Sequence, residues 1–292
     1  MRTFEPSDTR SIAPPKPRFR RSYAREPKRT LTGRSERGVV IPNYEDKYDA
    51  EALFSPAEVV GMGGEGLPDV PPAVVLGYQP KLTEFVEQRA DSPVRIVRSQ
   101  SLYPVTETVG YVPVHEWGVG APVSAMVTEN VIAAGAEAVV QLGGGAGLRT
   151  DVPPEAAVLP TDTIRDEGAS YHYVPDEESV TPTASLVDGL DDALSEAGFD
   201  TPRGTTWTTS AFYRETIPEV EAYGDDGVLT VDTEAAAIWA VCQYRGVDTA
   251  SVHELGGVLT SEGWRPETER DRGVVEMFDP VVVGLESHVA EG

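Results

Sequence analysis

The stretch that decides the fold is APVSAMVTENVIAAGAEAVVQLGGGAG at residues 121–147. Small and apolar residues from Pro122 to Ala134 favour a helix that Gly135 would end, and Ala138 to Leu142 are typical of a buried strand. That strand leads directly into glycines at positions 143, 144, 145 and 147. A helix followed by a buried strand and a glycine-rich loop is the repeating unit of an α/β sheet.

The same alternation of strand and helix continues on both sides of this unit. Strands are predicted at 73–76, 109–115, 138–142, 156–159, 205–209, 228–231 and 250–255. Helices are predicted at 80–89, 122–134, 183–198, 233–245 and 274–289, with a short one beginning at Ser55-Pro56. The pattern predicts an α/β fold, a three-layer α/β/α domain with a central mixed, largely parallel sheet. Ligands of such sheets bind in loops beyond the carboxyl ends of the strands.

Three segments are predicted along the 292 residues. Residues 1–38 form a basic, proline-rich tail predicted to be disordered, residues 39–72 an N-terminal extension, and residues 73–292 the folded domain. The tail holds eleven Lys and Arg against four Asp and Glu, whereas the whole chain has a formal net charge of −24. Such a tail is either simply solvated, or it contacts the acidic surface of its own protein or a nucleic acid.

The acidic body excludes some classes of partner. Its charge repels nucleic acid and anionic membranes, so neither is expected as a partner. Scattered acids with little lysine suit a cytosol of high ionic strength, which we interpret as a halophilic surface; a dedicated basic partner is the alternative. No apolar run reaches the length of a membrane span, and no secretory signal is apparent. With Cys242 as the only cysteine, a cytoplasmic location is expected.

Two glycine-containing loops could hold an anion. In LGYQPK at 76–81, a strand ends in glycine and a helix starts three residues later, so free N–H groups and Lys81 could bind a negative charge. An ordinary turn is the alternative. The glycines at 143–147 would let the backbone approach a ligand closely, or would form only a flexible turn. GMGGEG at 61–66 spells a dinucleotide motif but lacks the flanking strand and helix, so we interpret it as a loop.

Two polar loops complete the candidates. RDEGASYHY at 165–173 follows a strand, but a lone histidine such as His172 is more often structural than catalytic. VDTEAAA at 231–237 places Glu234 in the first turn of a helix that Asp232 or Thr233 could cap. The helix dipole favours an acid there even when the acid has no function.

Taken in order, these loops resemble the nucleoside phosphorylase family, which includes uridine phosphorylase and the hexameric purine nucleoside phosphorylases. The resemblance covers roughly residues 73–290 and rests mainly on 165–173, 231–237 and GVGAP at 118–122. Family members cleave the N-glycosidic bond of a nucleoside with inorganic phosphate, giving a free base and a pentose 1-phosphate. The resemblance therefore implies a pentosyltransferase of nucleoside metabolism and nucleotide salvage that binds nucleoside and phosphate and needs no metal or organic cofactor.

The resemblance also implies roles for individual residues. The phosphate ligands would be Gly77, Lys81, Arg98, Gln141, Gly143 and Gly144. The ribose hydroxyls would be bound by Thr233 and Glu234, and the base would lie against Phe212, Tyr213 and Gly145. Glu234 and Arg98 would be catalytic. Arg98 would be lent to the site of a neighbouring subunit, which implies a homo-oligomer built from dimers, such as a trimer of dimers.

The chain departs from the family pattern at two places. Where the family has an arginine and a hydroxyl at the glycine-rich loop, this chain has Gln141-Leu142-Gly143-Gly144, and losing such a charged contact costs about 1.5–3 kcal/mol. The acid that would protonate a purine is missing from GGVLT at 256–260. These departures favour a pyrimidine nucleoside and leave two alternatives open, a nucleosidase that uses water and a non-catalytic nucleoside-binding protein.

Overall fold

The computed structural model describes residues 47–48, 50–61, 68–97, 100–266 and 272–291. The tail predicted at 1–38 and the GMGGEG loop lie almost entirely outside these residues, and the three-segment division of the chain stays a prediction. None of the described helices is long and apolar enough to cross a membrane.

A sheet of ten strands runs through the described residues. The strands are β1 (Ala73–Gly77), β2 (Val94–Arg95), β3 (Ser101–Pro104), β4 (Val109–Pro113), β5 (Ala138–Gly147), β6 (Ala157–Asp166), β7 (Arg203–Thr209), β8 (Thr230–Asp232), β9 (Asp248–Thr260) and β10 (Gly263–Pro266). They follow the order β10-β9-β6-β7-β8-β5-β1-β4-β3-β2. Because β9 also pairs with β5, the strands β5, β9, β6, β7 and β8 close into a ring.

The pairing is mixed. Strand β1 runs parallel to both β4 and β5, and parallel pairs also join β5 to β9, β6 to β7 and β7 to β8. Antiparallel pairs join β5 to β8 and β6 to β9 within the ring, and β2, β3 and β10 to their neighbours at the edges. The predicted α/β fold with a mixed sheet and mostly parallel core strands is confirmed.

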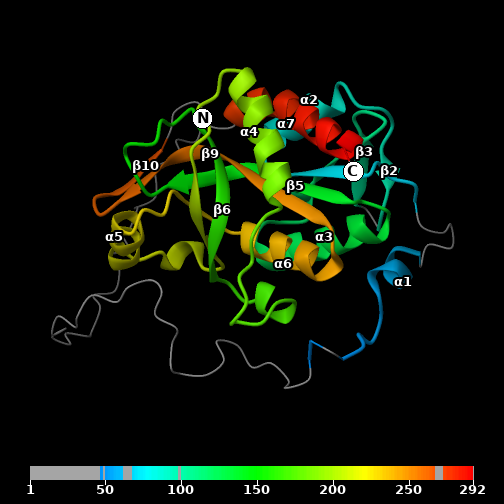
Figure 1. Ribbon diagram of the computed structural model, residues 1–292, viewed down its shortest axis with the longest axis horizontal. Coiled ribbons are helices and arrows are strands. Elements are labelled where there is room, and N and C mark those ends of the chain that lie inside the picture. The colour runs from blue at the N-terminus through cyan, green and yellow to red at the C-terminus, as the bar shows by residue number, and fades with distance from the viewer. Residues whose placement is uncertain (1–46, 49, 62–67, 98–99, 267–271, 292) are drawn as a thin grey trace, which may run out of the picture. The chain divides into compact units, whose positions relative to one another are not determined.

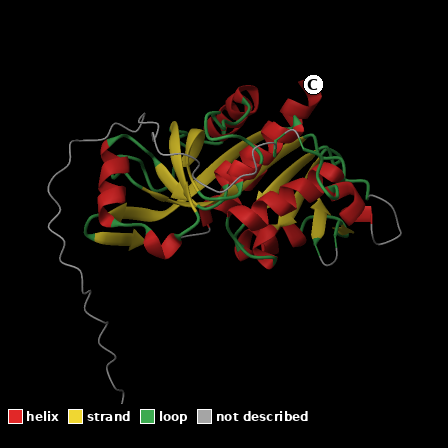
Figure 2. Ribbon diagram, turned by 90° about the horizontal axis from the view of Figure 1, so that it is seen from below, coloured by secondary structure: helices red, strands yellow, loops and turns green. Residues whose placement is uncertain are grey.

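Helices cover both faces of the sheet (Figures 1 and 2). One face packs against α2 (Pro80–Glu87), α4 (Ala184–Glu196) and α7 (Arg272–Glu291), and the other against α1 (Pro56–Gly61), α3 (Ala121–Ala133) and α6 (Ala235–Arg245). A further helix, α5 (Ile217–Asp225), lies over an apolar cluster that includes Trp207 and Val231. Short 3₁₀ turns cover Val114–Glu116, Ser170–His172 and Phe212–Arg214.

Both faces of β1 are buried because helices lie above and below it. Val75 packs in the core cluster that includes α2, α4 and α7, while Val74 and Leu76 pack in the cluster that includes α3 and α6. Removing such side chains from water stabilises the fold by roughly 1.5–3 kcal/mol each. This continuous apolar run, rather than an alternating one, is what a parallel strand covered on two sides requires.

Four strands of the ring, β5, β6, β7 and β9, are longer than their predicted ranges, whereas β8 covers only Thr230–Asp232 against the predicted 228–231. Strand β5 continues through the glycines, because Gly143, Gly144 and Gly145 stay extended and pair with β9. Strand β6 continues to Asp166, and β9 continues to Thr260 and turns back into β10. Helix α5 was not predicted, although Thr216 and Glu219 form a capping box at its start.

Candidate active site

A cavity of about 480 Å³ opens where β5, β8 and β9 reach their carboxyl ends. Its lining comes from five places in the sequence: Gln79; Gly144, Gly145 and Ala146; Phe212 and Glu215; Val231, Asp232 and Thr233; and Glu254, Gly256, Leu259 and Trp264. The volume lies within the range of pockets that hold small organic ligands. The position agrees with the rule that ligands of α/β sheets bind at strand carboxyl ends.

The two glycine-containing loops predicted to hold an anion lie side by side. Strands β1 and β5 are parallel neighbours, with Gly77 opposite Leu142. A side chain at Gly143 would come within 3.3 Å of Tyr78, and one at Gly144 within 3.0 Å of the Gln79 amide nitrogen. A larger residue at either position would make the Tyr78 or Gln79 side chain shift, whereas glycine lets β5 lie this close to the loop after β1 without such a shift.

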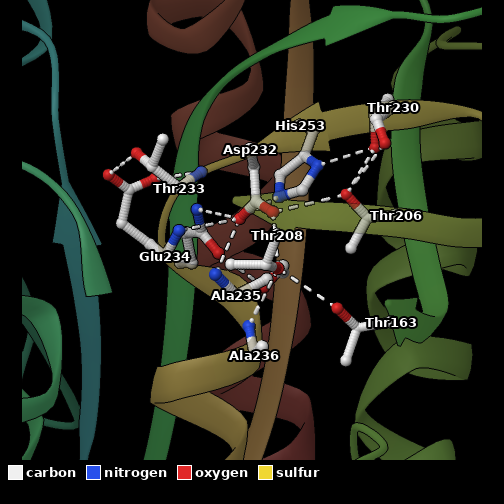
Figure 3. Close-up of polar contacts among 12 residues, drawn as sticks. Thr163, Thr206, Thr208, Thr230, Asp232, Thr233, Glu234, Ala235, Ala236 and His253 are labelled. Atoms are coloured by element: carbon white, nitrogen blue, oxygen red, sulfur yellow. Dashed lines mark hydrogen bonds and ion pairs between the residues drawn. The ribbon is translucent and has the colours of Figure 1, made fainter. Parts of the chain in front are cut away.

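The carboxylate of Asp232 organises the floor of the cavity (Figure 3). Its Oδ1 accepts a hydrogen bond from the Thr208 hydroxyl at 2.7 Å, and its Oδ2 accepts from the main-chain N–H groups of Glu234 at 3.1 Å and Ala235 at 2.6 Å. The Gln141 amide lies 3.4 Å from the same Oδ2. The buried carboxylate thus caps α6 from outside the helix and ties it to β7 and β5.

Glu234 is buried beside this carboxylate. Its Oε1 accepts from the N–H of Gly120 at 2.7 Å and from the Thr233 hydroxyl, and its Oε2 accepts from the Thr233 N–H at 3.2 Å. Burial, and then the negative charge of Asp232, raise the pKa of Glu234 to about 7. Glu234 lies directly behind Thr233 and does not line the cavity itself.

His253 completes the buried polar cluster. Its Nδ1 lies 3.2 Å from the Thr230 hydroxyl, and its Nε2 lies 3.8 Å from Oδ2 of Asp232 without a hydrogen-bond partner among the described residues. Complete burial lowers the pKa of this imidazole, against the opposing effect of Asp232. The ring is therefore uncharged near neutral pH.

Aromatic and acidic side chains form the outer part of the cavity. Phe212 is 59% exposed and lines the cavity, whereas the neighbouring Tyr213 is 94% exposed and does not. Trp264 on β10 also contributes to the lining. Glu215 is half-buried, and burial followed by the charge of Glu219 raises its pKa to about 7.

The structure brings together most of the residues that were predicted to form a site. Gly144, Gly145, Phe212 and Thr233 line the cavity. Gly77, Gly143 and Glu234 lie in the elements directly behind them. Their separate roles toward phosphate, ribose and base stay predictions.

Besides Gly77, Gly143 and Glu234, four further predicted site residues do not line the cavity. Gln141 is completely buried, with its amide held between Asp232 and the Ser251 hydroxyl, so its predicted contact with phosphate does not fit its position. Lys81 is exposed in the first turn of α2, and Tyr213 points to solvent. Arg98 lies outside the described residues.

Three acids and one aromatic residue line the cavity but were not predicted from the sequence as site residues. Asp232 was treated only as a possible cap, while Glu215, Glu254 and Trp264 were not considered as cavity residues. The capping box that follows Glu215 could have shown that this residue lies at the start of a helix. Nothing in the local sequence indicates that β9 and β10 bring Trp264 to the same cavity.

The RDEGASYHY stretch does not line the cavity, and its side chains form hydrogen bonds that hold the local backbone in place. Arg165 stacks on the ring of Tyr171 at 4.0 Å and donates hydrogen bonds to the main-chain oxygens of Val174 and Pro175. The Glu167 carboxylate accepts from the main-chain N–H groups that follow it. Among the described residues, no three His, Cys, Asp or Glu side chains converge as a metal site would require.

Proteins named as nucleoside phosphorylases have sequences similar to that of this chain. The chain is 24% identical to the guanosine phosphorylase of Halorubrum lacusprofundi over 49% of its own length and 60% of that protein. It is 24% identical to the uridine phosphorylase of Treponema pallidum over 63% of its own length and 76% of that protein. A DeoD-type purine nucleoside phosphorylase of Bacillus cereus is 28% identical over 58% of this chain and 72% of that protein.

Solved structures share the fold. The uridine phosphorylase of Vibrio fischeri superposes with a TM-score of 0.63 and 18% identity, covering 76% of this chain and 95% of that one. The purine nucleoside phosphorylase of Toxoplasma gondii, in complex with immucillin-H, gives a TM-score of 0.65 at 18% identity, covering 76% and 93%. A model of the phosphorylase superfamily matches residues 71–272, which include every residue that lines the cavity. The chain belongs to the phosphorylase superfamily, as its loops predicted.

Proposed function

We propose that the chain cleaves the N-glycosidic bond of a nucleoside with inorganic phosphate, releasing the free base and a pentose 1-phosphate. The observation that carries the proposal is that the glycines of β5, Phe212, and Thr233 with Glu234 directly behind it meet at one cavity. Relatives named as guanosine, uridine and purine nucleoside phosphorylases support it.

The sugar end of the nucleoside would lie against Thr233. A carboxylate accepts hydrogen bonds from two neighbouring hydroxyls, and Glu234 is held directly behind Thr233 by Gly120. A ribose hydroxyl that donated to Glu234 in addition to the Thr233 hydroxyl would favour the ionised form of Glu234, whose pKa is otherwise raised. The sugar and the carboxylate charge would then stabilise each other as positive charge develops on the ring.

The base would stack on Phe212, and phosphate would approach from the side of Gly144 and the loop after β1. A phosphate oxygen forms the new bond to C1′ as the bond from C1′ to the base nitrogen breaks. The bonding electrons leave with the base, which takes up the proton that hydrogen phosphate releases overall as it becomes the pentose 1-phosphate. Binding both reactants in one cavity removes most of the entropic cost of their meeting.

Hydrolysis is the second candidate, and one observation favours it. No lysine or arginine stands among the described residues that line the cavity. An anion there would lack a cation from the described part of its own chain, whereas water needs none. Phosphorolysis therefore depends on a charge supplied from elsewhere, and Arg98 of a neighbouring subunit is the predicted source.

The two reactions separate in one experiment. Purified protein is incubated with guanosine, inosine or uridine in high salt, with and without phosphate, and base and pentose 1-phosphate are followed by chromatography. Phosphorolysis predicts base release that requires phosphate and yields equimolar pentose 1-phosphate. Equal release without phosphate would establish hydrolysis, and no release from any nucleoside would refute both. Glu234→Gln should reduce release strongly, whereas Glu221→Gln on the exposed surface of α5 should not.

A further inference from the structure

The charged side chains that line the cavity are all acids. Glu215, Asp232 and Glu254 contribute carboxylates, and no cationic side chain of the described residues joins them. The part of a ligand that lies against these acids must therefore offer hydrogen-bond donors to carboxylate oxygens rather than further acceptors.

Glu215 differs from the other two acids in its contacts. The carboxylate of Asp232 is occupied by the start of α6 and by Thr208, and Glu254 accepts a hydrogen bond from the N–H of Gly273 at 2.9 Å. Glu215 makes no hydrogen bond or ion pair with any residue that the structure describes, although it is half-buried beside Phe212. Because Glu215 lines the cavity, a ligand that enters the cavity can reach this residue.

Nucleobases differ in what they can offer such a group. A 2-amino-6-oxopurine presents a ring N–H and an adjacent amino N–H, which match the two oxygens of one carboxylate. A 6-oxopurine without the amino group offers only the ring N–H. In uracil the single N–H lies between two carbonyl oxygens, and in adenine the amino group adjoins an acceptor nitrogen, so both repel an ionised carboxylate.

We propose that Glu215 determines base specificity by pairing with the adjacent N–H donors of a 2-amino-6-oxopurine, so that guanosine-type nucleosides are the preferred substrates. This inference rests on the proposed function and replaces the pyrimidine preference expected from the sequence. The raised pKa of Glu215 agrees with a carboxyl group that lacks a partner until ligand binds. Phe212 beside it would stack on the purine.

The test compares guanosine with inosine, which lacks only the amino group. In the unchanged protein, kcat/KM should be higher for guanosine. Glu215→Gln replaces one acceptor with a donor, and it should lower kcat/KM for guanosine by about 10- to 100-fold while changing the inosine value less than about threefold. Glu221→Gln, an exposed acid on α5, is the matched control and should leave both values unchanged.

Calorimetric binding of guanosine and inosine distinguishes failure of this inference from failure of the proposed function. If no nucleoside is turned over but guanosine binds more tightly than inosine, and Glu215→Gln removes that difference, the recognition stands and the reaction does not. The inference is overturned if Glu215→Gln leaves the guanosine-to-inosine ratio unchanged in turnover or binding. It is equally overturned if the unchanged protein prefers inosine, adenosine or uridine.

Discussion

Replacing Asp232 by alanine should destabilise the protein strongly, because this carboxylate connects α6 to the ring of strands. The substitution leaves the N–H groups of Glu234 and Ala235 without their acceptor in a buried place. Each unsatisfied buried group costs about 1–3 kcal/mol. Relief of the repulsion between Asp232 and Glu234 offsets part of this loss. We expect a net decrease of about 3 kcal/mol in the free energy of unfolding.

Urea denaturation followed by tryptophan fluorescence measures the change, since Trp207 and Trp239 are buried. Asp162→Ala is the control, because this exposed aspartate accepts one main-chain hydrogen bond within the described part of the chain, from Thr163 at 2.8 Å. Its replacement should cost about 0.5 kcal/mol or less. Asp232→Asn keeps one acceptor oxygen and should fall between the two. If Asp232→Ala were no more destabilising than Asp162→Ala, the hydrogen bonds of Asp232 would not stabilise the fold as we infer from their geometry.

Three further predictions concern the cavity and the strand behind it. Phe212→Ala should weaken nucleoside binding about 5- to 100-fold in calorimetry without changing the melting temperature, whereas Tyr213→Ala should do neither; equal effects would contradict stacking on Phe212. Gly77→Ala places a methyl group 2.3 Å from the Tyr111 ring and should lower the free energy of unfolding by about 1–3 kcal/mol. Urea denaturation measures this, and an unchanged midpoint would show that the ring can move. The pKa of Glu234 is raised from about 4.5 to about 7, so the folded state binds the extra proton and its free energy of unfolding should fall as pH rises through this interval. Denaturation at several pH values should show this fall in the unchanged protein and a shallower one in Glu234→Gln.

Local signals predicted the central strands and, apart from α5, the described α-helices. Helix α3 was expected at 122–134 and covers Ala121–Ala133, and β1 was expected at 73–76 and covers Ala73–Gly77. Periodicity, apolar runs and terminal glycines lie within a few residues of the elements that they specify. The extension of β5 through its glycines could not be predicted, because pairing with the distant strand β9 holds it extended.

The candidate site was likewise predicted where local sequence signals mark it and missed where distant segments form it. Gly144, Gly145 and Thr233 lie in stretches that were predicted as candidate loops, Phe212 was named from the family resemblance, and all four line the cavity. The hydrogen bonds around Asp232 could not be predicted, because its partners on β5 and β7 are far away in sequence. Gln141 was assigned to phosphate by its place before the glycines, but the pleat of β5 turns its side chain to Ser251 and Asp232.

The closed ring of strands has a consequence for how the protein can evolve and admit its ligands. Every strand of the ring has two neighbours, so none can peel away to widen the entrance, and the wall contributed by β5, β8 and β9 keeps its shape. Adjustment falls to parts outside the ring, the turn that carries Phe212 and Glu215 and the hairpin strand that carries Trp264. Substitutions in those two parts could therefore change which heterocyclic base is accepted, while the wall of the cavity proposed to bind the sugar stays the same.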